Sequence, residues 1–145
     1  MSIRLLHITP ELPPTVGGIA DYTAILSRRL VEVSGGSVVP TLIRAGWKGD
    51  GPTPETEFNT VDCAGKCDPA ALARTIREHV DSADRTVVLL QYSGYGYTQR
   101  GAPWWLVRGL QEACVPVITI FHELYATGPP WTSAFWLSPA QRYIA

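Results

Sequence analysis

The stretch 3-IRLLHITPELPPTVGGIADYTAILSRRL-30 places an aliphatic run, a loop rich in proline and glycine, and an amphipathic run in immediate succession. Ile3–Thr9 is aliphatic and bounded by turn signals, which predicts a buried strand. Residues Ile19–Val33 carry apolar side chains at helical spacing, which predicts an amphipathic helix laid on a sheet. The order is therefore strand, glycine loop, helix.

Gly17 and Gly18 stand at the start of this predicted helix. The first backbone N–H groups of a helix have no intrahelical partner, and their dipoles sum to a partial positive charge. Without a Cβ, both glycines can take a positive φ and let a phosphate or a sugar approach the main chain. The alternative is a merely tight, rigid connection, since neither a G-x-G-x-x-G pattern nor the lysine of a P-loop is present.

The rest of the chain continues the alternation of strands and helices. Predicted strands lie at Ser37–Ile43, Phe58–Cys63, Thr86–Leu90 and Val115–Phe121; predicted helices begin at Asp68-Pro69, cover Trp104–Ala113, and begin again at Ser138-Pro139. Pro40 removes a ladder donor and indicates an edge or a bulge. This alternation predicts an α/β fold with a mainly parallel sheet.

Composition narrows the classes of partner. The 145 residues carry a formal net charge of −1, so the protein lacks the positive electrostatic field that attracts nucleic acid. We therefore expect no nucleic-acid partner. No leader and no apolar run of about 20 residues is visible, so we expect a cytoplasmic protein. Three cysteines argue against a disulfide framework. Cys63 and Cys67 form a C-x-x-x-C pair for which free thiols are expected rather than a metal site.

Three loops with unusual residues follow predicted strands and should meet at one rim of the sheet. They are the Gly17-Gly18 loop, the loop Gln91–Tyr97 and the loop that starts with His122-Glu123. The middle loop offers amide, hydroxyl and ring groups suited to a sugar or a lipid-linked acceptor. Its candidate residues are Gln91, Tyr92, Ser93, Gly94 and Tyr95. An ordinary glycine-rich turn with exposed tyrosines is the alternative.

Three segments together resemble the N-terminal domain of a GT-B glycosyltransferase of the family 4 (group 1) type. They are "LLHITPELPPTVGGIADYTAILSRRL", "VVLLQYSGYGY" and "VPVITIFHELYATGPPW". The resemblance implies a Rossmann-like three-layer sandwich over residues 1–145 that mainly receives the acceptor. It also implies a C-terminal domain, absent from this sequence, that holds most of a nucleotide-diphosphate sugar. That sugar nucleotide would be a co-substrate of the intact enzyme, and no cofactor is expected on this chain.

The resemblance also implies roles for single residues. Gly17 and Gly18 would face the donor's phosphates, and His122 would lie near the transferred sugar, where imidazole can hydrogen-bond a hydroxyl or ease charge on the leaving group. A histidine that only ends a strand is the alternative. Asp21 lies in the first turn of the helix, where the helix dipole stabilises a carboxylate, so we expect a structural role for it. A catalytic role is the alternative. Glu123 should point away from His122, as neighbours on an extended chain do, and support the sugar site from behind.

The sequence departs from the family in lacking the E-x-x-x-x-x-x-x-E element that contacts the donor, and its final helix is cut short. We therefore expect the acceptor-side half of a retaining glycosyltransferase, inactive by itself, that pairs with the missing C-terminal domain. A stand-alone sugar- or phosphate-binding module of the same fold is the alternative.

Aromatic residues gather in the second half of the chain. They are Trp104, Trp105, Trp131, Phe135 and Trp136. They could form a lipid-facing patch, but no basic patch accompanies them, and tryptophans more often pack a core or a domain interface. Membrane contact is thus the less favoured interpretation, and self-association through an exposed aromatic face is a further one.

Overall fold

The computed structural model describes residues 2–82 and 84–144. Within these ranges five strands form one sheet, in the order β3-β2-β1-β4-β5, and all neighbouring strands are parallel. The strands are β1 (Ile3–Thr9), β2 (Val38–Arg44), β3 (Asn59–Asp62), β4 (Arg85–Tyr92) and β5 (Val117–Phe121). The expected parallel sheet is confirmed.

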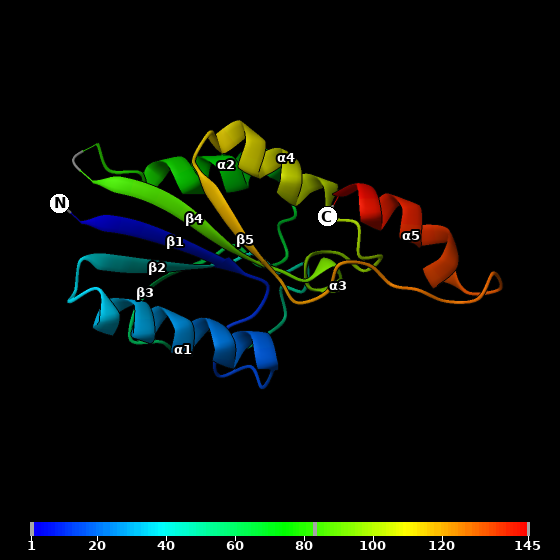
Figure 1. Cartoon of the computed structure of the whole chain (residues 1–145), viewed down its shortest axis with the longest axis horizontal. Coiled ribbons are helices and arrows are strands. Elements are labelled where there is room, and N and C mark those ends of the chain that lie inside the picture. The colour runs from blue at the N-terminus through cyan, green and yellow to red at the C-terminus, as the bar shows by residue number, and fades with distance from the viewer. Residues whose placement is uncertain (1, 83, 145) are drawn as a thin grey trace.

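Helices cover both faces of the sheet, which gives three layers (Figure 1). Helix α1 (Gly18–Val33) lies on one face, and α2 (Pro69–Glu78) and α4 (Trp104–Ala113) lie on the other. The short α3 (Gly94–Tyr97) follows β4, and α5 (Ser133–Ile144) lies beyond the carboxyl ends of the strands. The Rossmann-like α/β sandwich predicted from the sequence is therefore present.

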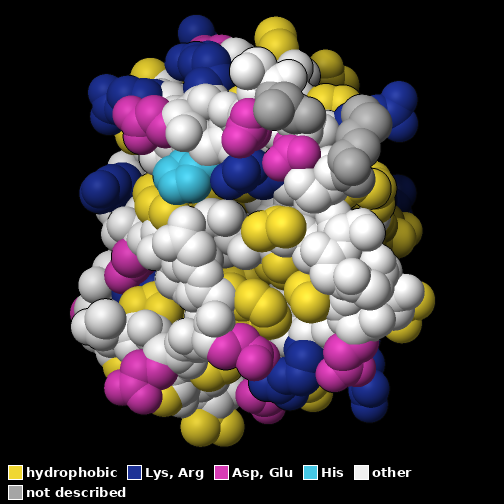
Figure 2. All heavy atoms as spheres, turned by 90° about the vertical axis from the view of Figure 1, so that its left-hand side faces the viewer, with side chains coloured by type: hydrophobic (Ala, Val, Ile, Leu, Met, Phe, Trp, Pro, Cys, Tyr) yellow, Lys and Arg dark blue, Asp and Glu magenta, His cyan; other side chains and the backbone are white. Residues whose placement is uncertain are grey.

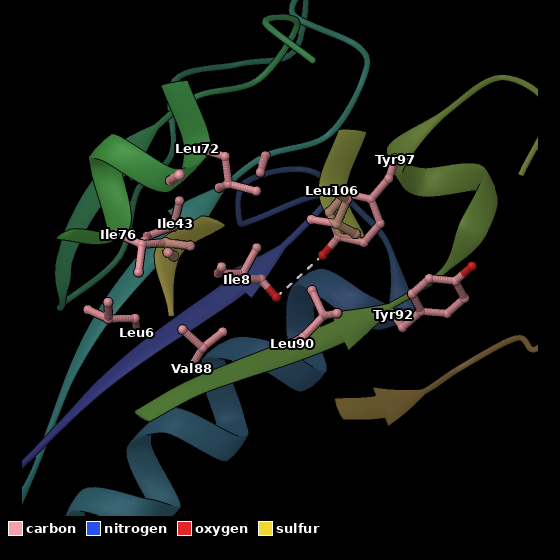
Figure 3. Close-up of a cluster of buried hydrophobic side chains, with 13 residues drawn as sticks. Leu6, Ile8, Ile43, Leu72, Ile76, Val88, Leu90, Tyr92, Tyr97 and Leu106 are labelled. Atoms are coloured by element: carbon pink, nitrogen blue, oxygen red, sulfur yellow. Dashed lines mark hydrogen bonds between the residues drawn. The ribbon is translucent and has the colours of Figure 1, made fainter. Parts of the chain in front are cut away.

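The apolar core fills the space between the sheet and the α2–α4 layer (Figure 3). Alternate residues of the central strands point into it, because successive side chains of a strand face opposite sides. They meet side chains from α2 and α4; the core includes Leu6, Ile8, Val88, Leu90, Leu72, Ile76 and Leu106. Tyr97 closes one end of this core and donates a hydrogen bond from its hydroxyl to the Gln91 carbonyl over 2.9 Å.

Local signals place two features correctly. Asp68 caps α2 by accepting hydrogen bonds from the N–H groups of Ala70 and Ala71, with Pro69 in the first turn, as expected of such a pair. Pro40 lies just before the β2–β3 pairing, which begins at Thr41 opposite Asn59. The proline therefore occupies the part of β2 that is locally an edge.

Two predicted boundaries are wrong. Gln91 and Tyr92 were expected in a loop, but they belong to β4, because they pair with Ile120 and Phe121 of β5. The last helix begins at Ser133 instead of Ser138, and Pro139 lies inside it. A Ser-Pro pair is favoured at a helix start because the missing N–H costs nothing there, but it does not forbid a helix that has already begun.

The amino ends of the strands form a face where side chains of both charges surround apolar ones (Figure 2). On this end Arg4 forms ion pairs with Asp81 at 3.0 Å and with Asp84 at 3.9 Å. The candidate site lies at the opposite end of the sheet, where the three loops singled out from the sequence begin (Figure 1).

Candidate functional site

Strands β1, β4 and β5 are neighbours in the sheet, so the loops that follow them share one rim. The backbone N–H of His122 donates to the Tyr92 carbonyl over 2.9 Å, which extends the β4–β5 pairing by one residue. The side chain of His122 also packs edge-to-face on Tyr22 of α1, with ring centroids 5.4 Å apart. His122 therefore lies beside the first turns of α1.

The two faces of the sheet differ in chemistry. The face toward α2 and α4 is apolar, whereas the face toward α1 carries buried polar side chains. Within β1, His7 and Thr9 alternate with the core residues Leu6 and Ile8. Thr9 receives a hydrogen bond from Thr23 of α1 over 3.2 Å. Side chains on this face must find hydrogen-bond partners inside the protein, because burial removes water from them.

Four side chains on the α1 side form a continuous hydrogen-bonded relay. It runs from Ser27 Oγ to His7 Nδ1 (2.8 Å), from His7 Nε2 to the Gln91 amide nitrogen (2.6 Å), and from the Gln91 amide oxygen to His122 Nε2 (2.6 Å). Ser27, His7 and Gln91 are fully buried, and His122 is exposed at the end of the relay. We refer to these residues as the histidine relay.

The orientation of the Gln91 amide determines which nitrogen of each histidine carries the proton. Burial lowers the pKa of His7 to about 4, so this imidazole is neutral at pH 7 and carries one proton. The Gln91 NH₂ group donates to His7 Nε2, so the proton of His7 is on Nδ1 and points to Ser27. At the other end the Gln91 oxygen accepts the Nε2–H of His122. Within residues 2–82 and 84–144, Nδ1 of His122 has no hydrogen-bond partner.

The glycine loop differs from the expectation in one respect. Neither Gly17 nor Gly18 has a positive φ; Gly17 is in extended backbone that any residue adopts. A Cβ on Gly17 would collide with the carboxylate of Glu11, whereas a Cβ on Gly18 would meet nothing within 4 Å. Of the two glycines, only Gly17 is approached closely, and the approaching group is the flexible end of an acidic side chain.

A carboxylate at that position has a physical rationale, since negative charge is stabilised near the N-terminus of a helix. Asp21, exposed in the first turn of α1, adds a second carboxylate. A phosphate at Gly17 would have to displace the Glu11 side chain.

The residues that follow Gln91 divide into buried and exposed ones. Ser93 is buried at the start of α3, and Gly94 is buried against the Gly101 carbonyl, where no Cβ could fit. Tyr95 is exposed, and its hydroxyl accepts a hydrogen bond from Gln141 over 3.2 Å. Of the two ring candidates in this stretch, Tyr95 is open to solvent and Tyr92 is not.

Tyr92 lies on the other face of the sheet from the histidine relay. Tyr92 contributes to the core cluster toward α2 and α4, and its hydroxyl is buried without a hydrogen-bond partner among the described residues. Burial raises the pKa of Tyr92, and the negative charge of Glu123 raises it further. Glu123 is therefore close to Tyr92, as expected from the alternation of side chains along an extended chain.

A pocket of about 270 Å³ opens beside the glycine loop. Its wall joins the segments after β1 and β2 to α3, and we call it the rim pocket. Its polar and aromatic lining consists of Glu11, Thr15, Arg44, Trp47, Lys48, Asp50 and Tyr95. The Arg44 guanidinium is held by the Asp62 carboxylate, and the Trp47 indole N–H donates to the Tyr95 carbonyl over 3.0 Å. Charged groups of both signs beside two aromatic rings suit a polyhydroxylated ligand.

The aromatic residues of the second half do not form one patch. Trp105 packs against the core and donates its indole N–H to the Tyr97 carbonyl over 3.1 Å. Trp104 contacts Tyr143, while Phe135 and Trp136 contact each other on the exposed side of α5. Among the helices in the described part of the chain, none is long and apolar enough to cross a bilayer.

Cysteine and acidic side chains do not assemble into a metal-binding cluster. Cys63 Sγ contacts the Thr75 hydroxyl at 3.7 Å, and the Cys67 thiol has its pKa raised by burial. Within residues 2–82 and 84–144, no group of three or more histidine, cysteine or acidic residues has an arrangement that could hold a metal ion.

Sequence reasoning missed His7 and Ser27. The available signal was a histidine in the middle of an otherwise aliphatic strand, which must be partnered if the strand is buried. No local pattern names that partner, because Gln91 is 84 positions away along the chain.

Comparison with known proteins adds no assignment. No protein-family model matches the chain, and no curated protein matches it significantly. The fold places the chain in the broad class of Rossmann-like α/β proteins, and the resemblance to family 4 glycosyltransferases remains a resemblance of motifs.

Proposed function

We propose that this chain is the acceptor-side half of a retaining glycosyltransferase. In the intact enzyme a sugar would move from a nucleotide-diphosphate sugar to a hydroxyl acceptor. The observation that carries the proposal is His122, held at the rim of a parallel sheet by the histidine relay and beside the first turns of α1. Functional groups of open α/β sheets gather at such a rim.

In the proposed reaction, the bond between the anomeric carbon and the diphosphate oxygen breaks. A bond from the acceptor oxygen to the same carbon forms with retained configuration, and the acceptor's proton leaves with the nucleoside diphosphate. The role assigned to His122 is to hydrogen-bond a hydroxyl of the transferred sugar through Nδ1, which has no partner within the described ranges. Such a contact orients the sugar, and orientation is a large part of the barrier reduction in transfer reactions.

The rim pocket is proposed to receive the acceptor. Trp47 and Tyr95 offer flat rings, and Glu11 and Asp50 offer carboxylates that accept hydrogen bonds from hydroxyls. Gly17 and Gly18 are proposed to face the donor's phosphates, and this requires that Glu11 turn away from Gly17 when the donor binds. Asp21 and Glu123 flank the site on α1 and behind β5.

The proposal is tested by joining the chain to a C-terminal donor domain encoded with it and measuring nucleoside diphosphate release with acceptor present. For His122→Ala we expect kcat to fall by about 10²-fold, the lower end of what one positioned group contributes. His79→Ala is the control, because His79 lies at the end of α2, where its ring bonds the Thr75 carbonyl and has no part in the histidine relay.

Two results would count against the proposal. Unchanged turnover in His122→Ala would remove the histidine from the reaction. Binding of a sugar phosphate without any transfer by the joined protein would identify a non-catalytic binding module instead.

A further inference from the structure

The histidine relay has a direction, and the direction decides what His122 offers to a ligand. With the Gln91 amide oriented as it is, every hydrogen bond of the relay is donated toward the Ser27 end: His122 Nε2–H to the Gln91 oxygen, the Gln91 NH₂ to His7, and His7 Nδ1–H to Ser27. Nδ1 of His122 is then a hydrogen-bond acceptor that faces outward.

The same four side chains have a second consistent arrangement. If the Gln91 amide turned over, its oxygen would accept from His7 Nε2–H, Ser27 would donate to His7 Nδ1, and the Gln91 NH₂ would donate to His122 Nε2. His122 would then carry its proton on Nδ1 and offer a donor outward. The Gln91 amide has its NH₂ group at one end and its oxygen at the other, so it donates to one histidine and accepts from the other. The tautomers of His7 and His122 must therefore change together.

We propose that Ser27 and His7 are positioning residues that stabilise, from inside the protein, the tautomer of His122 with its proton on Nε2. Ser27 lies at the inner end of the relay, where it accepts the Nδ1–H of His7. Because Ser27 gives that N–H a partner, His7 can leave Nε2 unprotonated, so that the Gln91 NH₂ donates to His7 and the Gln91 oxygen accepts from His122. The tautomer follows from the hydrogen bonds alone; its use in sugar transfer rests on the proposed function.

Burial makes the relay sensitive to the loss of one member. Ser27, His7 and Gln91 are fully buried, so a group that loses its partner is left without water to replace it. Without the Ser27 hydroxyl, the Nδ1–H of His7 would be orphaned. Moving that proton to Nε2 replaces the orphaned N–H by an unpaired ring nitrogen, since a buried acceptor is left unpaired more readily than a buried N–H. The move also turns the Gln91 amide over, because two donors cannot face each other.

The test is a change of Ser27 to Ala in the chain itself, read by ¹⁵N NMR of the histidine side chains at pH 7.5. The two ring nitrogens of a neutral imidazole give well-separated signals, so the protonated nitrogen is identified directly. In the wild type we expect His122 protonated on Nε2 and His7 protonated on Nδ1. In Ser27→Ala we expect the loss of this single pattern, with His122 protonated on Nδ1 in a large share of molecules.

Thr23→Ala is the matched control. Thr23 is a buried hydroxyl residue one turn earlier on the same side of α1, and it bonds Thr9 and the Ile19 carbonyl instead of the relay. We expect both histidines to keep the wild-type pattern in this variant. If the substitutions acted by destabilising α1, the histidine signals would change in both variants. A change in Ser27→Ala alone indicates that Ser27 acts on the tautomer through the relay.

An unconstrained imidazole already carries its proton mainly on Nε2, so the decisive sample is the Ser27→Ala variant. If His122 keeps the wild-type pattern there, or if the wild type itself carries the proton on Nδ1, the proposal is overturned. The measurement needs no sugar and no second domain. It can therefore fail while the proposed function stands, and it can succeed if the function proves to be different.

Discussion

His7 has no solvent exposure, and burial lowers its pKa to about 4 from 6.5. Between these two pH values the unfolded chain binds a proton at this histidine and the folded chain does not. By linkage, the stabilising contribution is complete above about pH 6.5 and is lost as the pH falls toward 4, by an amount on the order of 3 kcal/mol.

We expect the free energy of unfolding, measured with urea at several pH values, to fall across this window in the wild type. In His7→Gln the decrease should largely disappear, although the variant starts from a lower stability at pH 7. Asp62 contributes in the same direction only below its ordinary pKa of 3.8, because hydrogen bonding to Arg44 lowers its pKa. Equal pH dependence of the two proteins between pH 6.5 and 4 would contradict the burial argument.

At the scale of elements, the packing of α4 on α2 depends on Gly109. A Cβ there would lie 3.0 Å from the Pro69 carbonyl oxygen and 3.0 Å from Leu72 Cδ2, both in α2. The carbonyl belongs to the backbone and cannot rotate away. We expect Gly109→Ala to lower the free energy of unfolding by about 1–3 kcal/mol, reduced by up to about 1 kcal/mol of gained helix propensity.

Gly18→Ala is the control for this change, since a Cβ at Gly18 meets nothing within 4 Å in the first turn of α1. There the same substitution should be neutral or stabilising by up to about 1 kcal/mol. Chemical denaturation of the two variants checks the difference. If Gly109→Ala and Gly18→Ala have the same free energy of unfolding relative to the wild type, α4 can move away from α2 without a loss of stability. That result would contradict the packing argument.

At the scale of the whole molecule, Gln141 connects the segment after β5 to the loops at the rim. The sheet is stabilised by the apolar core, against which Ile144 of α5 also packs, and Gln141 adds a polar connection. Its buried amide accepts from the Ala126 N–H over 2.8 Å and donates to the Arg100 carbonyl over 3.0 Å and to the Tyr95 hydroxyl over 3.2 Å.

We therefore expect Gln141→Ala to accelerate hydrogen–deuterium exchange across residues 124–144 while leaving the strands as protected as in the wild type. Gln99→Ala, which removes an exposed amide, should leave both regions unchanged. Accelerated exchange in β1 and β4 of the Gln141 variant would show that the segment unfolds together with the sheet.

Sequence alone could predict what depends on neighbours along the chain. The periodicity of Ile3–Thr9 and of the following helix, the Asp68-Pro69 cap and the alternation of elements indicated the α/β fold and the rim at which the site lies. That His122 and Glu123 face opposite sides stays a prediction, supported by the effect of the Glu123 charge on Tyr92. These features are local, since strand alternation, helical period and capping act within a few residues.

Only the tertiary structure decided which side chains meet. Strand register extended β4 through Gln91 and joined that residue to His7 and to His122, 84 and 31 positions away. The chain path also brought the Glu11 carboxylate against Gly17, at a glycine whose φ is not positive. Neither contact leaves a local pattern, because each depends on where distant segments of the backbone are held relative to one another.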